Sequence, residues 1–307
     1  MSVFGMVSTR DSLACTELGL DSFFKTTNLE KNDEFFLIDN DQSLGSEQIS
    51  KFPITLKLNE SSLGFAANAN QCVAIALERK QDLYFLNNDV IFTENWYQYL
   101  QAAPDDMLCT PLSNREIEYV SSVANVRNNE VVSALHCKPP PIEINQYRGN
   151  EFHLNSIALA HQRNVYGYHK VIHLPFFCVR IPYKILATVG KFDEAYGQGG
   201  GEDFDYCGRC YLAGHQVGFA VSAYMLHFGG QSTYVAESEK DRQQEREAHF
   251  RKVFKDKWGS AFHDLLLNED DSILKREPKL QALFDSIQLK EAIEFMIDGR
   301  QIPIRIL

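Results

Sequence analysis

Residues 83–89 read Leu-Tyr-Phe-Leu-Asn-Asn-Asp, an apolar run followed at once by polar residues. A run of this length predicts a buried β-strand from Leu83 to Leu86, with Asp89 just beyond its carboxyl end. The alanine-rich stretch before it, Gly64 to Arg79, favours a helix. The sequence therefore predicts a helix that leads into a strand, with polar side chains where that strand ends.

The same alternation continues toward the N-terminus. It predicts strands at Ser2 to Val7, Glu34 to Ile38 and Ile54 to Leu58, and a helix at Leu13 to Thr26. Strands that alternate with helices form a mostly parallel sheet with helices on its faces. Ligands bind such sheets beyond the carboxyl ends of the strands, where Thr9-Arg10, Asp39 and Asp89 fall. We expect these polar clusters to converge on one crevice.

The second half of the chain is less regular. Between Val131 and Val171 the alternation is weak, which predicts loops and short strands. Elsewhere the patterns predict strands at Leu108 to Asn114, Leu174 to Ile181, Val217 to Val221 and Ala223 to His227, and helices at Trp96 to Ala102, Tyr183 to Gly190, Phe204 to Ala213, Glu237 to Lys257, Ile273 to Leu289 and Lys290 to Ile297. The predicted fold class is α/β: residues 1–233 form a single Rossmann-like domain with a mixed, mostly parallel sheet flanked by helices. Residues 234–307 form a C-terminal helical extension.

Composition limits the class of protein. With 307 residues, 44% of them hydrophobic, the chain can bury a large core. No apolar run approaches the roughly 20 residues that cross a bilayer, and the N-terminus lacks the basic start and apolar block of a signal peptide. The seven cysteines are scattered, which suits reduced thiols, and Cys207 and Cys210 are interpreted as helix-face packing rather than a metal or redox motif. We expect a cytoplasmic protein that is not integral to a membrane.

Charge is unevenly distributed along the chain, whose net charge is −11. Residues 134–184 hold six Lys or Arg and two acidic residues. An acidic protein is a poor general binder of nucleic acid. A locally basic segment within it nonetheless favours a polyanionic partner, unless it is an incidental surface patch.

Four short motifs follow one another along residues 1–233. They are Val7-Ser8-Thr9-Arg10 with Phe36 to Asp41; Asn59 with Gly64-Phe65-Ala66-Ala67-Asn68-Ala69-Asn70; Tyr84-Phe85-Leu86-Asn87-Asn88-Asp89; and Val189 to Glu194 with Gly201-Glu202-Asp203-Phe204-Asp205, closing at His227. In this order they resemble the inverting family 2 glycosyltransferases of the GT-A fold. Each motif alone is a weak signal, and their order carries the resemblance. It implies a nucleoside-diphosphate sugar as donor and a hydroxyl group as acceptor.

A metal site fits this chemistry. A leaving nucleoside diphosphate gains negative charge, which a divalent cation offsets. A carboxylate at a strand end, Asp89, is a natural ligand for Mg²⁺ or Mn²⁺. The resemblance implies His227 as a second ligand, whereas alone it would be interpreted as a structural histidine. Asn87 departs from the family's commonest Asp-x-Asp form, which removes one negative charge from the site.

Inversion needs a general base on the face of the sugar opposite the leaving group. Glu202-Asp203 opens a predicted helix after a glycine-rich loop, and alone the pair is equally typical of acids that cap a helix. The resemblance implies that Asp203 is the base and that Glu202 positions the acceptor. The residues that it assigns to donor binding are Thr9, Arg10, Asp39 and Asn88, although Asp39 also stands in an ordinary turn sequence.

The predicted function is therefore that of a metal-dependent inverting glycosyltransferase, a hexosyl- or pentosyltransferase that uses Mn²⁺ or Mg²⁺ and acts on a glycan hydroxyl. The basic segment leaves open a hydroxymethylated base in DNA as acceptor, which would flip out of the stack. The alternative from a different functional class is a protein that binds a nucleotide sugar without catalysing its transfer. A dinucleotide-dependent oxidoreductase is disfavoured, because no Gly-x-Gly-x-x-Gly follows the first strand. Three roles remain open for the C-terminal helices: they could pack on the core, form a homodimer contact or contact the acceptor.

Overall fold

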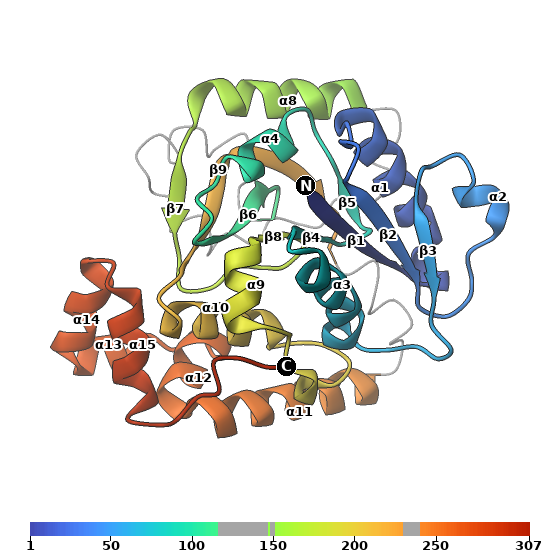
Figure 1. Cartoon of the computed structure of the whole chain (residues 1–307). Helices are drawn as coiled ribbons and strands as arrows, with labels where there is room; N and C mark the ends of the chain where they lie inside the picture. The colour runs from blue at the N-terminus through green and yellow to red at the C-terminus, as the bar shows by residue number, and fades with distance from the viewer. Residues whose placement is uncertain (116–146, 148–150, 230–239) are drawn as a thin grey trace.

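The computed structural model of the chain describes residues 1–115, 147, 151–229 and 240–307. A mixed sheet lies at the centre and helices cover both of its faces (Figure 1). The strands of the described part are β1 (Ser2–Ser8), β2 (Glu34–Asp39), β3 (Thr55–Leu58), β4 (Asp82–Leu86), β5 (Val90–Ile91), β6 (Met107–Ser113), β7 (Tyr168–Lys170), β8 (Cys178–Ile181) and β9 (Gln216–His227). They are ordered β3-β2-β1-β4-β8-β6-β9-β5, with β7 paired to β9.

Most paired residues of the sheet belong to parallel ladders, as predicted. β3, β2, β1 and β4 pair in parallel, and so do β6 and β9. β8 runs antiparallel to both β4 and β6, so these two strands point the same way. The carboxyl ends of β1, β2, β4, β6 and β9 consequently lie at one edge of the sheet, called the carboxyl edge below.

Helices flank the sheet on both faces. Those of the described part are α1 (Leu13–Thr26), α2 (Ser46–Ile49), α3 (Phe65–Arg79), α4 (Trp96–Gln101), α8 (Glu151–Asn164), α9 (Tyr183–Val189), α10 (Glu202–Leu212), α11 (Lys240–Trp258), α12 (Ser260–Leu267), α13 (Ser272–Arg276), α14 (Pro278–Asp285) and α15 (Leu289–Ile297), with 3-10 turns η1 (Arg10–Ser12) and η2 (Glu194–Tyr196).

Alternate residues of the central strands enter two different hydrophobic clusters. Leu83 and Phe85 of β4 face the cluster that includes α3, α9 and α10, whereas Tyr84 and Leu86 face the cluster that includes α1 and α4. A strand buried on both faces has no polar side, which explains the continuous apolar run from residue 83 to 86. Gly5 of β1 allows α3 to approach closely, because a Cβ there would lie 2.4 Å from the Cys72 Sγ atom.

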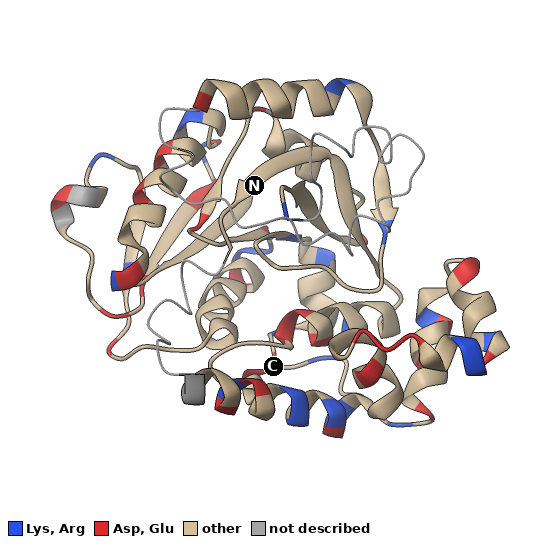
Figure 2. Cartoon of the chain, turned by 180° about the vertical axis from the view of Figure 1, so that it is seen from behind, with Lys and Arg blue, Asp and Glu red and all other residues tan. Residues whose placement is uncertain are grey.

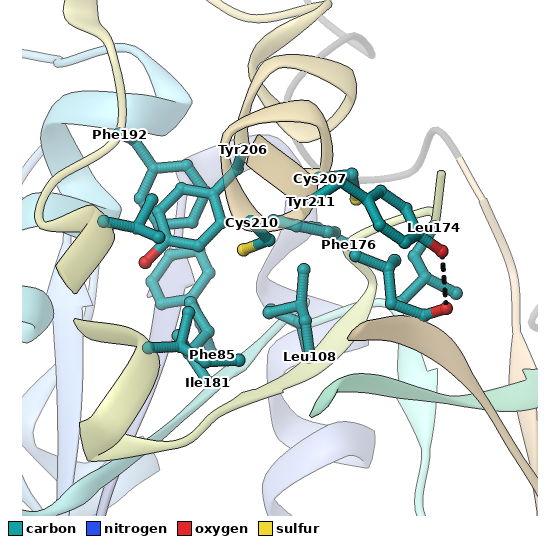
Figure 3. Close-up of a cluster of buried hydrophobic side chains, with 14 of the residues drawn as sticks. Phe85, Leu108, Leu174, Phe176, Ile181, Phe192, Tyr206, Cys207, Cys210 and Tyr211 are labelled. Carbon is teal, nitrogen blue, oxygen red and sulfur yellow. Dashed lines mark hydrogen bonds between the residues drawn. The ribbon is translucent and has the colours of Figure 1, made fainter. Parts of the chain in front are cut away.

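The first cluster extends under α10, where Cys207 and Cys210 lie buried beside Tyr206 and Leu108 (Figure 3). Both cysteines are free thiols, as are the other four described cysteines. Burial raises the pKa of Cys207 well above its usual value, so the group stays a protonated, apolar side chain. The interpretation of this pair as helix-face packing is confirmed.

Three sequence predictions were wrong. The region predicted as loops and short strands contains a 14-residue helix, α8. Its buried face consists of Leu154, Ala158 and His161, and since a histidine takes one of the three positions the apolar periodicity is weak. The two strands predicted between Val217 and His227 are one strand, β9, whose register shifts opposite Pro111 and Leu112.

The third wrong prediction concerns the C-terminal segment, where α12 was not expected and the helix expected at Ile273 to Leu289 is two short helices, α13 and α14. The helix expected at Lys290 to Ile297 is present as α15. Phe250 and Phe254 of α11 are buried in the same cluster as α10, as their spacing predicts. Blue and red residues run along the outer side of α11 (Figure 2), as expected of a solvated charged face. The predicted division at residue 233 falls outside the described residues and stays a prediction.

Candidate active site

Asp89 and His227 meet at the carboxyl edge. Asp89 follows β4, and the short pairing of β5 with β9 places Val90 opposite His227. The Asp89 Oδ1 atom lies 3.4 Å from the His227 Nε2 atom. The Phe228 N–H also donates to the Asp89 carbonyl oxygen at 2.9 Å. Two residues that are 138 positions apart in the chain are thus held side by side.

The surroundings of this pair fit a metal ion. Asp89 is fully buried, and the His227 ring stacks on Phe177 with centroids 4.8 Å apart. The His227 Nδ1 atom is buried and has no hydrogen-bond partner in the described part of the chain. A carboxylate oxygen with an imidazole nitrogen suits Mn²⁺. The described residues contain no group of three or more His, Cys, Asp or Glu that could hold a metal, so the remaining ligands would come from substrate and water.

A small cavity of about 40 Å³ lies beside the ends of β1 and β4. Thr9, Asn87 and Asn88 line it, together with Phe65 and Asn68 of α3. Thr9 and Asn88 therefore come together as predicted. Asn88 donates to Ser12 Oγ at 2.7 Å and to Thr16 Oγ1 at 2.8 Å, so its amide nitrogen holds α1 in place. Its Oδ1 atom is buried and has no partner among the described residues.

Asp39 and Arg10 lie apart from that cavity. Asp39 is buried and lines an open depression of about 510 Å³, together with Leu44 and Leu58. Its two carboxylate oxygens accept the backbone N–H groups of Ser43 and Leu44, each at 3.0 Å. The Arg10 side chain is exposed and lines neither cavity.

Glu202 and Asp203 are the first two residues of α10. Gly201 occupies the N-cap with φ of 85°, a conformation that favours glycine. Glu202 is buried and accepts the Gly200 N–H at 2.6 Å, while Asp203 accepts the Phe204 N–H at 2.8 Å. Burial raises the pKa of both carboxyl groups, and the charge of Asp203 raises the pKa of Glu202 further. The N-cap position itself belongs to the glycine and to neither acid.

The acid pair lies at the same edge of the sheet as the metal pair. α10 leads into β9, whose first residue Gln216 donates to Asp106 at the opposite edge at 2.8 Å. The 11 residues of α10 rise about 16 Å along the helix axis. The preceding glycine-rich loop also contacts the start of α3, where the Phe65 N–H donates to the Gln198 carbonyl at 3.1 Å. Phe65 lines the small cavity, so the loop adjoins the crevice.

One short segment connects the acid pair and the metal pair. The His173 ring lies 4.6 Å from the ring of Phe204, the neighbour of Asp203. The Phe177 ring lies 4.8 Å from His227. Since residues 173 and 177 are four positions apart, their Cα atoms are at most about 14 Å from each other. Burial lowers the pKa of His173 to about 4, so this ring is neutral between the two pairs.

Sequence reasoning missed one residue at the metal pair. Asn114, just after β6, accepts the His227 backbone N–H at 2.8 Å and is itself buried. An asparagine after a strand is typical of an ordinary turn, and nothing in its neighbours distinguishes it.

Of the four described Lys and Arg residues of the basic segment, Arg163, Lys170 and Lys184 are exposed and Arg180 is buried. Arg180 is buried in ion pairs with Asp82 at 2.7 Å and Asp105 at 2.9 Å. Asp82 begins β4, so these charges lie at the edge opposite Asp89. Burial also lowers the pKa of His161, which bonds to the Val221 carbonyl and stays neutral. Lys138 and Arg148 lie outside the described residues.

No protein-family profile and no curated protein matches the sequence. Solved structures do match its fold. GalNAc-T7 with UDP, GalNAc and Mn²⁺ has a TM-score of 0.51 at 14% identity, over 74% of this chain and 43% of that one. The mannosyltransferase PcManGT from Pyrobaculum calidifontis, with GDP-Man and Mn²⁺, has a TM-score of 0.50 at 12% identity, over 83% of this chain and 63% of that one. S. aureus TarS 1–349 with UDP-GlcNAc has a TM-score of 0.49 at 15% identity, over 96% and 84%.

The first two matches show that the chain has a GT-A-like glycosyltransferase fold. The chain spans less than two thirds of the length of either. In the described part of the chain, no helix is long and apolar enough to cross a membrane.

Proposed function

We propose that this chain is a metal-dependent inverting glycosyltransferase that moves a sugar from a nucleoside diphosphate to a glycan hydroxyl. The observation that carries the proposal is the 3.4 Å approach of the Asp89 carboxylate to the His227 imidazole. It occurs at the carboxyl edge of a GT-A-like fold, where an acid pair also begins a helix.

On the donor side, Asp89 and His227 would hold Mn²⁺ or Mg²⁺. The ion, when bound, offsets the negative charge that the departing diphosphate gains. Two solved structures of the same fold contain Mn²⁺, one with UDP and one with GDP-Man, which supports this assignment. Thr9 and Asn88 line the small cavity beside these strand ends and are assigned to the donor, and Asp39, which lines the larger depression, is assigned to its nucleoside. Arg10 is exposed next to Thr9 and is assigned to the same part of the donor.

Asp39 keeps capacity for a nucleobase although its carboxylate already binds two backbone N–H groups. Each carboxylate oxygen accepts one hydrogen bond, from Ser43 or Leu44. A carboxylate oxygen has about two lone-pair sites, so each can accept another donor. The adjoining depression of about 510 Å³ offers space for a base.

On the acceptor side, Asp203 takes the proton of the attacking hydroxyl. The hydroxyl oxygen forms a bond to the anomeric carbon as the bond from that carbon to the diphosphate breaks, and the configuration inverts. Burial raises the pKa of Asp203, which makes its carboxylate a stronger base than an exposed aspartate. Glu202 positions the acceptor beside it.

The test is turnover with a panel of uridine, thymidine, guanosine and cytidine diphosphate sugars, measured as release of the nucleoside diphosphate with Mn²⁺ present. We expect one donor to be used, activity to stop in excess chelator, and added Mn²⁺ to restore it. Full activity in excess chelator would exclude the metal role of Asp89 and His227. Binding of a donor without any turnover across a wide set of acceptors would favour a non-catalytic sugar-nucleotide-binding protein.

Salt dependence separates the two acceptor classes. A neutral glycan predicts turnover that changes little between low and physiological salt. A DNA acceptor predicts a steep loss of activity, because each neutralised phosphate contributes to the salt slope. The buried ion pairs of Arg180 leave Arg163, Lys170 and Lys184 as the exposed described cations of the basic segment that a DNA acceptor could contact.

A further inference from the structure

Asn114 has an unfilled hydrogen-bond donor at the metal pair. Its Oδ1 atom accepts the His227 backbone N–H at 2.8 Å. Its Nδ2 atom is buried and has no partner in the described part of the chain. If the Oδ1 and Nδ2 atoms of Asn114 were exchanged, two N–H donors would face each other at His227. The hydrogen bond from His227 therefore fixes the orientation of the Asn114 amide. The NH₂ group is therefore left for a ligand.

A buried donor without a partner is unusual enough to require an explanation. Such a group costs folding free energy that a bound acceptor would recover. The donor stands at the end of β6, beside the strand β9 that carries His227. It is one of a small set of buried, unpartnered polar atoms of described residues at this edge, which also includes Asn88 Oδ1 and His227 Nδ1.

The next residue, Arg115, brings a positive charge to the same place. Its Nη1 atom is 3.5 Å from the carbonyl oxygen of Phe228, the neighbour of His227. The side chain lies flat over Gly229, where an added Cβ would come within 2.6 Å of the Arg115 Cζ atom. The side chain of Arg115 is exposed, and its hydrogen bond to Phe228 is at the long limit for such bonds. A guanidinium placed in this way can still bind an anion through its other N–H groups.

We propose that Asn114 and Arg115 bind the diphosphate of the nucleotide donor, Asn114 through its free NH₂ group and Arg115 through its guanidinium. This inference rests on the proposed function, because it takes the ligand of the Asp89–His227 pair to be a nucleoside diphosphate. Asn114 also fixes the backbone of His227, so it joins the position of the metal ligand to the position of the phosphates. Gly229 permits the contact, since any side chain there would displace the guanidinium.

The test measures binding of uridine, thymidine, guanosine and cytidine diphosphates, each with Mn²⁺, by calorimetry at one ionic strength. The four nucleosides serve as probes that lack phosphates. Arg115→Gln should weaken binding of the favoured diphosphate roughly 10- to 100-fold and leave binding of the nucleoside unchanged. Arg115→Lys should recover part of the loss, because it keeps the charge without the planar fork. Arg305→Gln, at an exposed arginine near the C-terminus, is the matched control and should bind like wild type.

Asn114→Ala should show a similar selective loss for the diphosphate. Because this variant also removes the acceptor of the His227 N–H, its thermal unfolding is measured in parallel. Arg115 is exposed, so its variants test the proposal even if Asn114→Ala does not fold. Unchanged diphosphate affinity in Arg115→Gln would overturn the proposal, as would an equal loss of nucleoside and diphosphate binding. Wild-type protein that binds none of the four nucleoside diphosphates would contradict the proposed function itself, whereas binding that the variants retain would contradict this inference alone.

Discussion

The Asp205 carboxylate accepts a hydrogen bond from the Trp258 indole, with the Oδ1 and Nε1 atoms 2.8 Å apart. This contact joins α10, which begins with the acid pair, to the last residue of α11. Lys257 pairs with the same Oδ1 atom at 2.7 Å, and Arg209 pairs with Oδ2 at 2.7 Å. The Tyr196 hydroxyl also donates to Oδ1, at 3.3 Å, so four side chains satisfy this fully buried carboxylate. The C-terminal helices thereby stabilise the helix that presents Glu202 and Asp203.

Trp258→Phe should lower the free energy of unfolding by about 1–3 kcal/mol, because the carboxylate loses a buried donor while most of the ring volume remains. Urea denaturation measures the loss. Trp96→Phe is the matched control, since Trp96 donates to a neutral acceptor, Thr27 Oγ1, at 2.8 Å. The free energy lost in Trp258→Phe should exceed that lost in Trp96→Phe. Equal losses would show that the charge of Asp205 does not strengthen its hydrogen bond with Trp258.

Asp203→Asn should lower the transfer rate by roughly 10²- to 10⁴-fold, the usual contribution of a general base, and leave donor affinity unchanged. Asparagine keeps an oxygen for the Phe204 N–H, so α10 should begin as before. Rates are compared with those of Asp298→Asn, an exposed position near the C-terminus. Turnover at the wild-type rate in Asp203→Asn would reject Asp203 as the base.

Glu202→Gln should make the protein more stable at pH 8 than wild type. Folding raises the pKa of Glu202 through burial and the nearby Asp203 charge, so the folded state holds this proton more tightly than the unfolded chain. The free energy of unfolding of wild type therefore falls as pH rises above the ordinary glutamate pKa of about 4.3. Glutamine has no such proton, and the difference between the proteins should shrink toward pH 4.

Thermal unfolding across this pH range measures the effect of Glu202→Gln. Glu291→Gln, at an exposed position of α15, serves as control and should show no pH-dependent gain. A constant difference between Glu202→Gln and wild type from pH 4 to pH 8 would contradict the raised pKa.

His227→Ala should increase the Mn²⁺ concentration needed for half-maximal turnover by at least tenfold, which corresponds to about 1.4 kcal/mol. The imidazole is removed while Asp89 stays, so some activity should return at high Mn²⁺. His153→Ala, at an exposed histidine of α8, should leave the Mn²⁺ requirement unchanged. An unaltered requirement in His227→Ala would show that the ring does not bind the ion.

The first half of the fold was predictable because three of its strands, β1, β2 and β4, are buried on both faces. Short continuous apolar runs such as residues 83–86 favour a strand because they are too short for a helix and polar residues follow at once. α8 was not predictable in this way. His161 occupies a core position by bonding the Val221 carbonyl at 2.6 Å, and a hydropathy pattern counts it as polar.

Only those residues of the candidate site that belong to the four ordered motifs were predictable from the sequence. The resemblance assigned Asp89 and His227 to one metal, and the pairing of β5 with β9 brings them together. It could not assign Asn114, whose importance comes from a hydrogen bond to a residue 113 positions away. Such a contact leaves no local mark in the sequence.

The most direct test of the account is anomalous scattering at the manganese edge from crystals grown with Mn²⁺ and the preferred nucleoside diphosphate. A metal site at this pair predicts one strong peak within bonding distance of both the Asp89 carboxylate and the His227 imidazole, with the nucleotide phosphates beside it. A manganese peak elsewhere on the molecule, or a nucleotide bound away from this pair, would contradict it.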